Sequence, residues 1–156
     1  MNRSNARDSE IRIVPLTREH LERLVEMEAQ VFSVPWSLES FQELFRYDYC
    51  HYLVAVNEAG IPVGIAGMTL LEDDGEIEKV MVDPAYRRRG IAAALLEGLF
   101  QMGAELGAKA YTLEVRVGNE GAIRLYEKYG FRTEGVRPNF YEKPKEDALI
   151  MWRRKT

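Results

Sequence analysis

Cysteine and histidine are scarce in this sequence of 156 residues. It contains one cysteine, Cys50, and two histidines, His20 and His51. A single thiol cannot form an intramolecular disulfide, and these three residues do not have the spacing of a zinc site. We therefore expect no metal site, and we expect Cys50 to be a buried and inert side chain without a nucleophilic role.

The sequence also lacks an excess of positive charge. It has 21 Lys and Arg residues against 25 Asp and Glu residues, so the formal net charge is −4 and the pI is about 5.4. Domains that bind nucleic acids are usually basic. Two short basic runs, 87–89 and 153–155, do not change this balance, and we expect no nucleic-acid partner.

No long hydrophobic run is present. The longest stretch without a charged residue, 59–71, contains a proline and three glycines and is shorter than the roughly 20 apolar residues of a membrane-spanning helix. The polar start of the chain has no apolar core of the kind found in secretory signals. We expect a cytoplasmic protein without membrane contact, with a flexible tail at 1–10 and one domain at 11–156.

The chain shows strand and helix patterns in turn, which predicts an α/β fold, or α+β by some definitions. The sheet is expected to be mixed and mostly antiparallel, because turn-rich connections at 57–60 and 72–75 imply a meander. Strands are predicted at 11–14, 51–56, 63–71, 76–82, 110–115, 131–136 and 148–152, and helices at about 17–34, 37–45, 90–106 and 120–129.

The stretch 80–96 carries the strongest chemical signal. A strand ends at Asp83, three arginines follow at 87–89, and Gly90 opens a helix. The start of a helix offers unpaired backbone N–H groups and the positive end of a dipole, and small residues at Gly90 and Ala92 would let phosphate oxygens reach those groups. The pattern predicts a phosphate or pyrophosphate site; the alternative is a solvated basic turn.

The segment Arg87-x-x-Gly90-x-Ala92 resembles the Arg/Gln-x-x-Gly-x-Gly/Ala signature of the GCN5-related N-acetyltransferases, the GNAT family. Further segments, in the same order along the chain, resemble the branch of that family that acetylates ribosomal-protein alanine. Together they extend the resemblance from about Ile11 to Trp152. They are Pro35-Trp36-Ser37, Leu113-Glu114-Val115-Arg116, the stretch from Asn119 to Phe131, and the stretch from Glu146 to Met151.

The resemblance implies an N-acetyltransferase that uses acetyl-CoA as cosubstrate. Its pyrophosphate would lie on the backbone amides near the start of the helix at Gly90, its pantetheine arm would be held by Asn119, and its acetyl end would lie along the preceding strand. The implied cofactor-binding residues are Val80, Met81, Val82, Arg87, Arg88, Arg89, Gly90, Ile91, Ala92, Ala93 and Asn119.

The resemblance also implies that Glu114 is the general base and Tyr126 the general acid. The strand period places Glu114 on the face opposite Leu113 and Val115, so its carboxylate can point away from the core. Asn119 and Tyr126 lie two helical turns apart and share a face. Each residue alone has a simpler interpretation, a solvated strand glutamate and a core tyrosine.

The implied acceptor is the N-terminal α-amine of a protein, in this branch the alanine of small-subunit ribosomal protein eighteen. An α-amine has a pKa of about 7.7–8.0 against about 10.4 for lysine, so a modest base can deprotonate it. Trp36 and Tyr141 are expected in loops that contact the substrate. The alternatives are a small-molecule amine acetyltransferase and a non-catalytic acyl-CoA-binding module; the sequence does not predict the oligomeric state.

Overall fold

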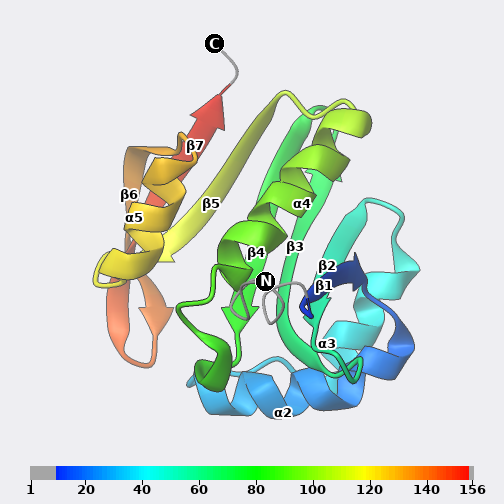
Figure 1. The fold of residues 1–156 in the computed structure, drawn as a ribbon. Helices are drawn as coiled ribbons and strands as arrows, with labels where there is room; N and C mark the ends of the chain where they lie inside the picture. The colour runs from blue at the N-terminus through cyan, green and yellow to red at the C-terminus, as the bar shows by residue number, and fades with distance from the viewer. Residues whose placement is uncertain (1–9, 155–156) are drawn as a thin grey trace, which may run out of the picture.

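Seven strands form one sheet in the order β1-β2-β3-β4-β5-β7-β6 in the computed structural model, which describes residues 10–154 (Figure 1). Neighbouring strands are antiparallel except β4 and β5, which are parallel. The predicted mixed, mostly antiparallel sheet is confirmed, and the predicted tail lies outside the described residues except for Glu10. The strands are β1 (Arg12–Pro15), β2 (Cys50–Val56), β3 (Pro62–Leu71), β4 (Asp74–Val82), β5 (Ala110–Arg116), β6 (Arg132–Glu142) and β7 (Lys145–Arg154).

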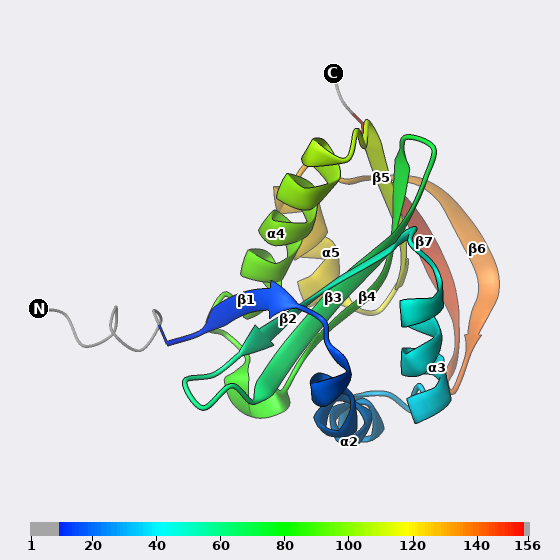
Figure 2. The same cartoon turned by 90° about the vertical axis from the view of Figure 1, so that its right-hand side faces the viewer.

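Helices cover both faces of the sheet. The helices α4 (Ile91–Glu105) and α5 (Glu120–Lys128) lie on one face, and α2 (Leu21–Val31) and α3 (Leu38–Glu43) lie at the other (Figure 2). Two apolar clusters fill the layers, one around α4 with Leu95, Leu99 and Leu113, and one around α2 with Leu24 and Met81. Short 3₁₀ turns complete the chain at η1 (Arg18–His20), η2 (Leu44–Arg46) and η3 (Pro84–Tyr86).

The first helix is shorter than predicted. Thr17 precedes the 3₁₀ turn η1 rather than α2 itself. At the other end α2 stops at Val31, because Phe32 is already extended at φ −114° and ψ 143°. The residues 32–36 therefore form a loop rather than the last turn of the helix. Ser37 caps α3 as predicted, its hydroxyl accepting a hydrogen bond of 3.2 Å from the amide of Ser40.

The two closing strands are longer than predicted. Strands β6 and β7 form a hairpin in which Tyr141 pairs with Glu146 and Glu142 with Lys145. The sequence predicted closing strands only at 131–136 and 148–152, with Tyr141 in the loop between them. The hairpin accommodates Pro138 by interrupting the pairing between Arg137 and Tyr141, where Asn139 takes a positive φ of 52°. Tyr141 accordingly lies in β6 and not in a loop.

Strands β4 and β5 separate part-way along the sheet. They pair from Asp74↔Ala110 only as far as Ile77↔Leu113. At this point the register with β3 shifts, since Met68 faces Ile77 and Gly67 faces Lys79, so that Glu78 is an extra residue. A bulge of this kind bends a strand and increases its twist. Beyond it Met81 belongs to the cluster on the α2 side, whereas Ile77 belongs to the cluster on the α4 side.

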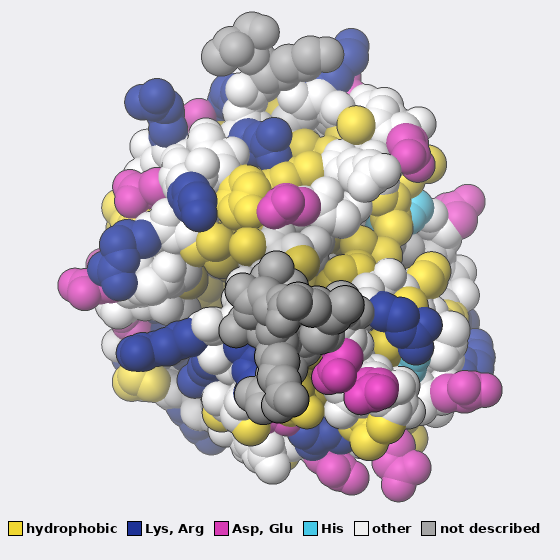
Figure 3. Space-filling view, in the orientation of Figure 1, with side chains coloured by type: hydrophobic (Ala, Val, Ile, Leu, Met, Phe, Trp, Pro, Cys, Tyr) yellow, Lys and Arg dark blue, Asp and Glu magenta, His cyan; other side chains and the backbone are white. Residues whose placement is uncertain are grey.

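Charge of both signs is dispersed over the surface that carries α4 and α5. Lys and Arg side chains alternate there with Asp and Glu side chains (Figure 3). This distribution agrees with the small net charge of the sequence, −4. Among residues 10–154, no helix combines the length and the apolar character needed to cross a bilayer.

Candidate functional site

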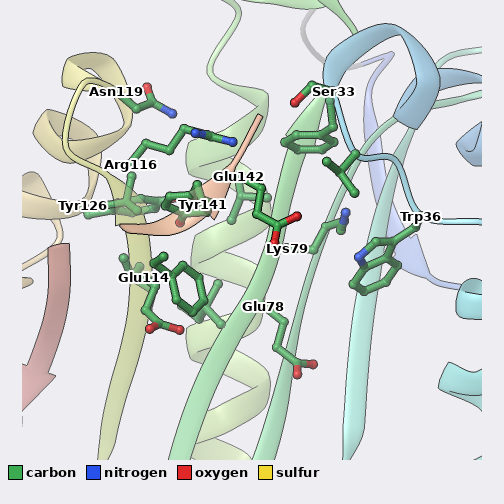
Figure 4. Close-up of a pocket in the computed structure, with 17 residues that line it drawn as sticks. Ser33, Trp36, Glu78, Lys79, Glu114, Arg116, Asn119, Tyr126, Tyr141 and Glu142 are labelled. Atoms are coloured by element: carbon green, nitrogen blue, oxygen red, sulfur yellow. The ribbon is translucent and has the colours of Figure 1, made fainter. Parts of the chain in front are cut away.

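A cavity of about 390 Å³ lies where β4 and β5 diverge (Figure 4). One wall comes from β5 and α5, the opposite wall from β4 and the loop after α2, and the end of β6 closes a third side. The structure brings together here six residues that the sequence singled out from five separate segments: Trp36, Val80, Glu114, Asn119, Tyr126 and Tyr141.

Glu114 projects from β5 into this cavity. Its neighbours Leu113 and Val115 are buried in the cluster beneath α4, so the predicted division of the strand into two faces is confirmed. The Glu114 side chain is 27% exposed, and its Oε2 atom is 2.5 Å from Nε of Arg137 on β6. That contact is an ion pair without the alignment of a hydrogen bond, since Oε2 has no hydrogen-bond partner. Oε2 is itself shielded from solvent, so this oxygen is occupied by the contact with Arg137.

Tyr126 enters the same cavity from α5. The residue is 7% exposed and its ring packs edge-on against Phe131 at 5.9 Å between centroids. Burial, and secondarily the nearby Tyr141, raises the pKa of Tyr126 to about 12. The phenol is therefore protonated across the physiological range, and its O–H group can donate a hydrogen bond into the cavity.

Asn119 lines the cavity and also has a structural role. It is the N-cap residue of α5, and its Oδ1 atom accepts a hydrogen bond of 3.2 Å from the amide of Ala122. The cap uses only the carbonyl half of the side chain. The two donors of its amide group remain free for a ligand in the cavity.

Trp36 and Tyr141 stand on opposite sides of the cavity (Figure 4). The Trp36 ring packs edge-on against Phe41 at 5.2 Å. The Tyr141 ring carries the guanidinium of Arg116 at 4.2 Å from its centroid. Both rings are held by neighbours within the protein, so they form firm aromatic sides to the space between them.

The predicted anion site lies at the start of α4. Gly90 caps the helix in the left-handed conformation, at φ +75°, and its carbonyl accepts the first helical hydrogen bond from Ala94 at 3.0 Å. The amides of residues 91–93 precede that bond and have no acceptor within the helix. A Cβ atom placed on Gly90 would meet nothing within 4 Å. Among the described residues, the space beside Gly90 is therefore open, which favours the approach of a phosphate to this helix start.

The remaining predicted cofactor residues follow β4 towards this helix start. Val82 packs partly against the α4 cluster. The side chains of Met81 and Ile91 are buried, at 2% and 3% exposure, so only their main chains can reach a ligand. Arg88 has a positive φ of 66°, and the guanidinium of Arg89 lies 4.9 Å from the centre of the Tyr86 ring. Arg87 is exposed, and Ala92 and Ala93 are half-buried in the first turn of α4.

Comparison with known proteins gives the family. The model of the acetyltransferase (GNAT) family matches residues 21–131. The chain belongs to the GNAT family. A Mycobacterium tuberculosis protein named N-alpha-acetyltransferase RimI is 36% identical over 149 residues, covering 92% of this chain and 92% of its own. The Escherichia coli ribosomal protein bS18-alanine N-acetyltransferase is 33% identical over 127 residues, covering 80% of this chain and 84% of its own.

A solved structure agrees with these sequence matches. The crystal structure of the ribosomal-protein-S18-alanine N-acetyltransferase from Escherichia coli superimposes with a TM-score of 0.84 and 29% identity. It covers 92% of this chain and 93% of that chain. The predicted family, its branch and the predicted fold are confirmed. This chain is an acyltransferase that uses acetyl-CoA as acetyl donor.

The acetyltransferase fold leaves room for such a donor along β4. Beyond Ile77 the described part of the chain provides no strand on the β5 side of β4, so the backbone groups of that edge face the gap. The cavity lining reaches Val80 on this strand, and the helix start at Gly90 follows ten residues later in the chain. An extended arm with amide groups followed by a pyrophosphate matches both features, because the edge offers hydrogen bonds and the helix start binds anions.

Sequence reasoning missed Lys79, which lines the acetyltransferase cavity, and two residues paired with its lining: Glu28 with Lys79, and Arg137 with Glu114. Glu28 stands at an apolar position of the α2 periodicity, and it is completely buried. A charged residue in that register was the available signal for a buried polar interaction. No comparable signal marked Lys79, because the bulge at Glu78 changes the face on which it lies.

Proposed function

We propose that this acetyltransferase transfers the acetyl group to the N-terminal α-amine of a protein, and that its substrate is the first residue, alanine, of ribosomal protein bS18. The relatives described above, 33% and 36% identical, are named for α-amine or bS18-alanine acetylation. The observation that carries the proposal is the position of Glu114 and Tyr126 in a cavity flanked by Trp36 and Tyr141. That arrangement supplies a base, an acid and two aromatic sides for an extended peptide end.

Glu114 acts as the base in this proposal. The attacking amine must be neutral, so a proton has to leave the α-ammonium group before or during attack. The Glu114 carboxylate accepts it, directly or through one water molecule. The ion pair with Arg137 keeps the carboxylate turned towards the cavity edge. Because an α-amine has a pKa of about 7.7–8.0, this removal requires far less basicity than removal from lysine.

Tyr126 acts on the other side of the reaction. Acetyl-CoA supplies an activated thioester, and its sulfur leaves as the new amide forms. With a pKa of about 12 the Tyr126 phenol keeps its proton and can donate to that sulfur. Glu114 and Tyr126 thus take opposite roles in the proposal, because a carboxylate can accept a proton and the Tyr126 phenol keeps its own.

The donor is held by the residues predicted from the sequence. Its pyrophosphate lies on the amides between Arg88 and Ala93, its pantetheine arm follows β4 from Val82 to Val80, and Asn119 donates from the facing wall. The open space at Gly90 and the unpaired edge of β4 support this placement. Each contact is made by main-chain groups or small polar side chains, which suits a ligand common to the whole family.

The test is acetyl transfer to short synthetic peptides that differ only in their first residue. We expect acetylation of the peptide with the bS18 N-terminus, located on the α-nitrogen by fragment mass spectrometry. An N-terminally blocked peptide with an internal lysine, spermidine and an amino sugar serve as comparison acceptors. If the protein acetylates the small amines but none of the peptides, it is a small-molecule acetyltransferase and the proposal is refuted.

A further inference from the structure

A buried ion pair lies behind one wall of the acceptor cavity. Glu28 on α2 is completely buried, and the Lys79 side chain from β4 is 7% exposed. The Lys79 ammonium donates a hydrogen bond to Oε2 of Glu28. Figure 4 shows Lys79 extending from β4 towards Trp36, with Glu114 on the opposite wall. Lys79 therefore lines the cavity and Glu28 lies behind it, although none of the chemistry above uses either residue.

Both members of the pair contact the loop 32–36. The Lys79 ammonium lies 3.9 Å from the centre of the Trp36 ring and 4.6 Å from that of Phe32. The second oxygen of Glu28 accepts a hydrogen bond of 2.8 Å from the backbone amide of Trp36. Two rings and one amide of the same loop are thus attached to a single pair of charges.

The same loop reaches across to the hairpin of β6 and β7. The Ser33 hydroxyl donates a hydrogen bond to the carbonyl of Lys143, which lies in the turn of that hairpin. The hairpin brings Tyr141 and Arg137 to the other side of the cavity. A shift of the loop 32–36 would therefore also move the hairpin on the other side of the acceptor cavity.

Stability alone does not account for this arrangement. A buried ion pair loses much of its attraction to the desolvation of both charges, and well-packed apolar residues can replace such a pair without loss. Burial lowers the pKa of Lys79, which agrees with a substantial desolvation cost. The pair fixes the positions of the two rings, because the Lys79 ammonium contacts both ring faces while it is bound to the Glu28 carboxylate.

We propose that Glu28 and Lys79 are positioning residues of the acceptor site, holding the loop 32–36 so that Phe32 and Trp36 form the surface against which the first residue of the acceptor packs. This inference rests on the proposed function for the identity of the acceptor. The residues act through the loop and do not take part in proton transfer. Their loss should weaken acceptor binding while acetyl-CoA binding stays the same.

Lys79→Met is the direct test, because methionine keeps an unbranched stem and removes the charge. We expect the KM for the acceptor peptide to rise about tenfold, the size of a lost pair of cation–π contacts. The KM for acetyl-CoA and the kcat at saturating peptide should stay close to wild type. An unchanged acceptor KM in the folded variant would overturn the proposal.

A second variant keeps the test valid if Lys79→Met unfolds through the unpaired Glu28 carboxylate. In Glu28→Gln/Lys79→Met neither position of the pair carries a charge, and glutamine can still accept a hydrogen bond from the Trp36 amide. We expect its stability to recover while the acceptor KM stays raised. Recovery of both would mean that the pair serves stability only. Arg23→Met, which removes another ion pair between α2 and the end of β4, is the matched control and should leave the acceptor KM unchanged.

Fluorescence separates this inference from the proposed function. Trp36 is one of two tryptophans, so Trp152→Phe leaves it as the single reporter. In that background Lys79→Met should shift its emission and increase its quenching by acrylamide, with no acceptor present. If wild-type protein acetylates no α-amine, the proposed function fails but this measurement still tests the loop. Identical quenching with and without Lys79 would refute the positioning role itself.

Discussion

In the proposed site, the donor end is formed by one continuous stretch, 80–93, and Asn119, whereas the acceptor end is assembled from side chains of α2, the loop after it, β4, β5 and β6. The donor end offers mostly main-chain groups, at the free edge of β4 and the first turn of α4. The acceptor end depends on individual side chains such as Glu114, Trp36 and Tyr141. Substitutions should therefore affect the two ends differently, and the following variants test that expectation.

Glu114→Gln should have the largest effect. Glutamine keeps the size of the side chain but cannot accept the ammonium proton, so kcat should fall by roughly 10²–10⁴-fold. Acetyl-CoA affinity, measured by calorimetry, should be nearly unchanged because the donor end is intact. Wild-type turnover from pH 6 to 9 would show that Glu114 is a structural residue and that the base lies elsewhere.

Ala92→Glu should damage the donor end and spare the acceptor end. A carboxylate in the first turn of a helix is favourable for folding, but here it would repel the pyrophosphate. Acetyl-CoA affinity should fall roughly 10–100-fold, the value of one charge-assisted hydrogen bond. Gly90→Val would be harder to interpret, because any side chain is strained at φ +75° and the variant could lose stability as well as affinity.

Ala92→Ser is the matched control for that experiment, since serine is small and uncharged. Its acetyl-CoA affinity should stay within about twofold of wild type, well inside the cost of one neutral hydrogen bond. The melting temperature of Ala92→Glu should be at least that of the wild type. A raised acceptor KM with normal acetyl-CoA affinity would contradict the assignment of this helix start to the donor.

Tyr126→Phe tests a residue that faces both ends. Loss of the hydroxyl removes the donor to the leaving sulfur, and kcat should fall about tenfold, less than for the base because a thiolate leaves readily. Since the pKa of Tyr126 is about 12, its ionisation should produce no decline of kcat below about pH 11 in the wild type. A pH–rate profile of both proteins checks this point.

The raised pKa of Tyr126 also predicts how the free energy of unfolding changes at high pH. Its pKa is about 12 in the folded protein against about 10 in an unfolded chain, so the folded state holds this proton more tightly. The contribution is complete below pH 10 and is lost as the pH rises towards 12. Between pH 9 and 11 the wild type should lose about 1.4 kcal/mol more unfolding free energy than Tyr126→Phe. Urea denaturation at both pH values measures the difference, and equal losses would contradict it.

Asn119→Ser should have the smallest effect. Serine is as good an N-cap as asparagine, so α5 and the stability should be preserved. The amide donors are lost, and the KM for acetyl-CoA should rise about threefold, the value of one neutral hydrogen bond. Asn119→Ala should show the same KM change together with a loss of roughly 1 kcal/mol of stability from the missing cap. Equal KM values in all three proteins would limit Asn119 to its capping role.

Much of the fold could be predicted because its signals are local. The period of α4, the alternation in β5 and the left-handed glycines at Gly90, Gly107 and Gly130 all depend on neighbouring residues. The closing hairpin was predicted too short, because β6 and β7 pair with each other as far as Glu142↔Lys145, and pairing with β5 extends β7 through Arg154. The pattern of each segment alone did not report this pairing between strands.

By itself, the sequence determined the family and the order of the elements and suggested the proposed donor end, because each depends on contiguous residues whose spacing follows the geometry of a helix or strand. Only the tertiary structure decided that β4 and β5 separate after Ile77 and Leu113, and that the bulge at Glu78 turns Lys79 towards Glu28. These features depend on the register between strands, which residues far apart in the chain set together, and no pattern within either segment reports it.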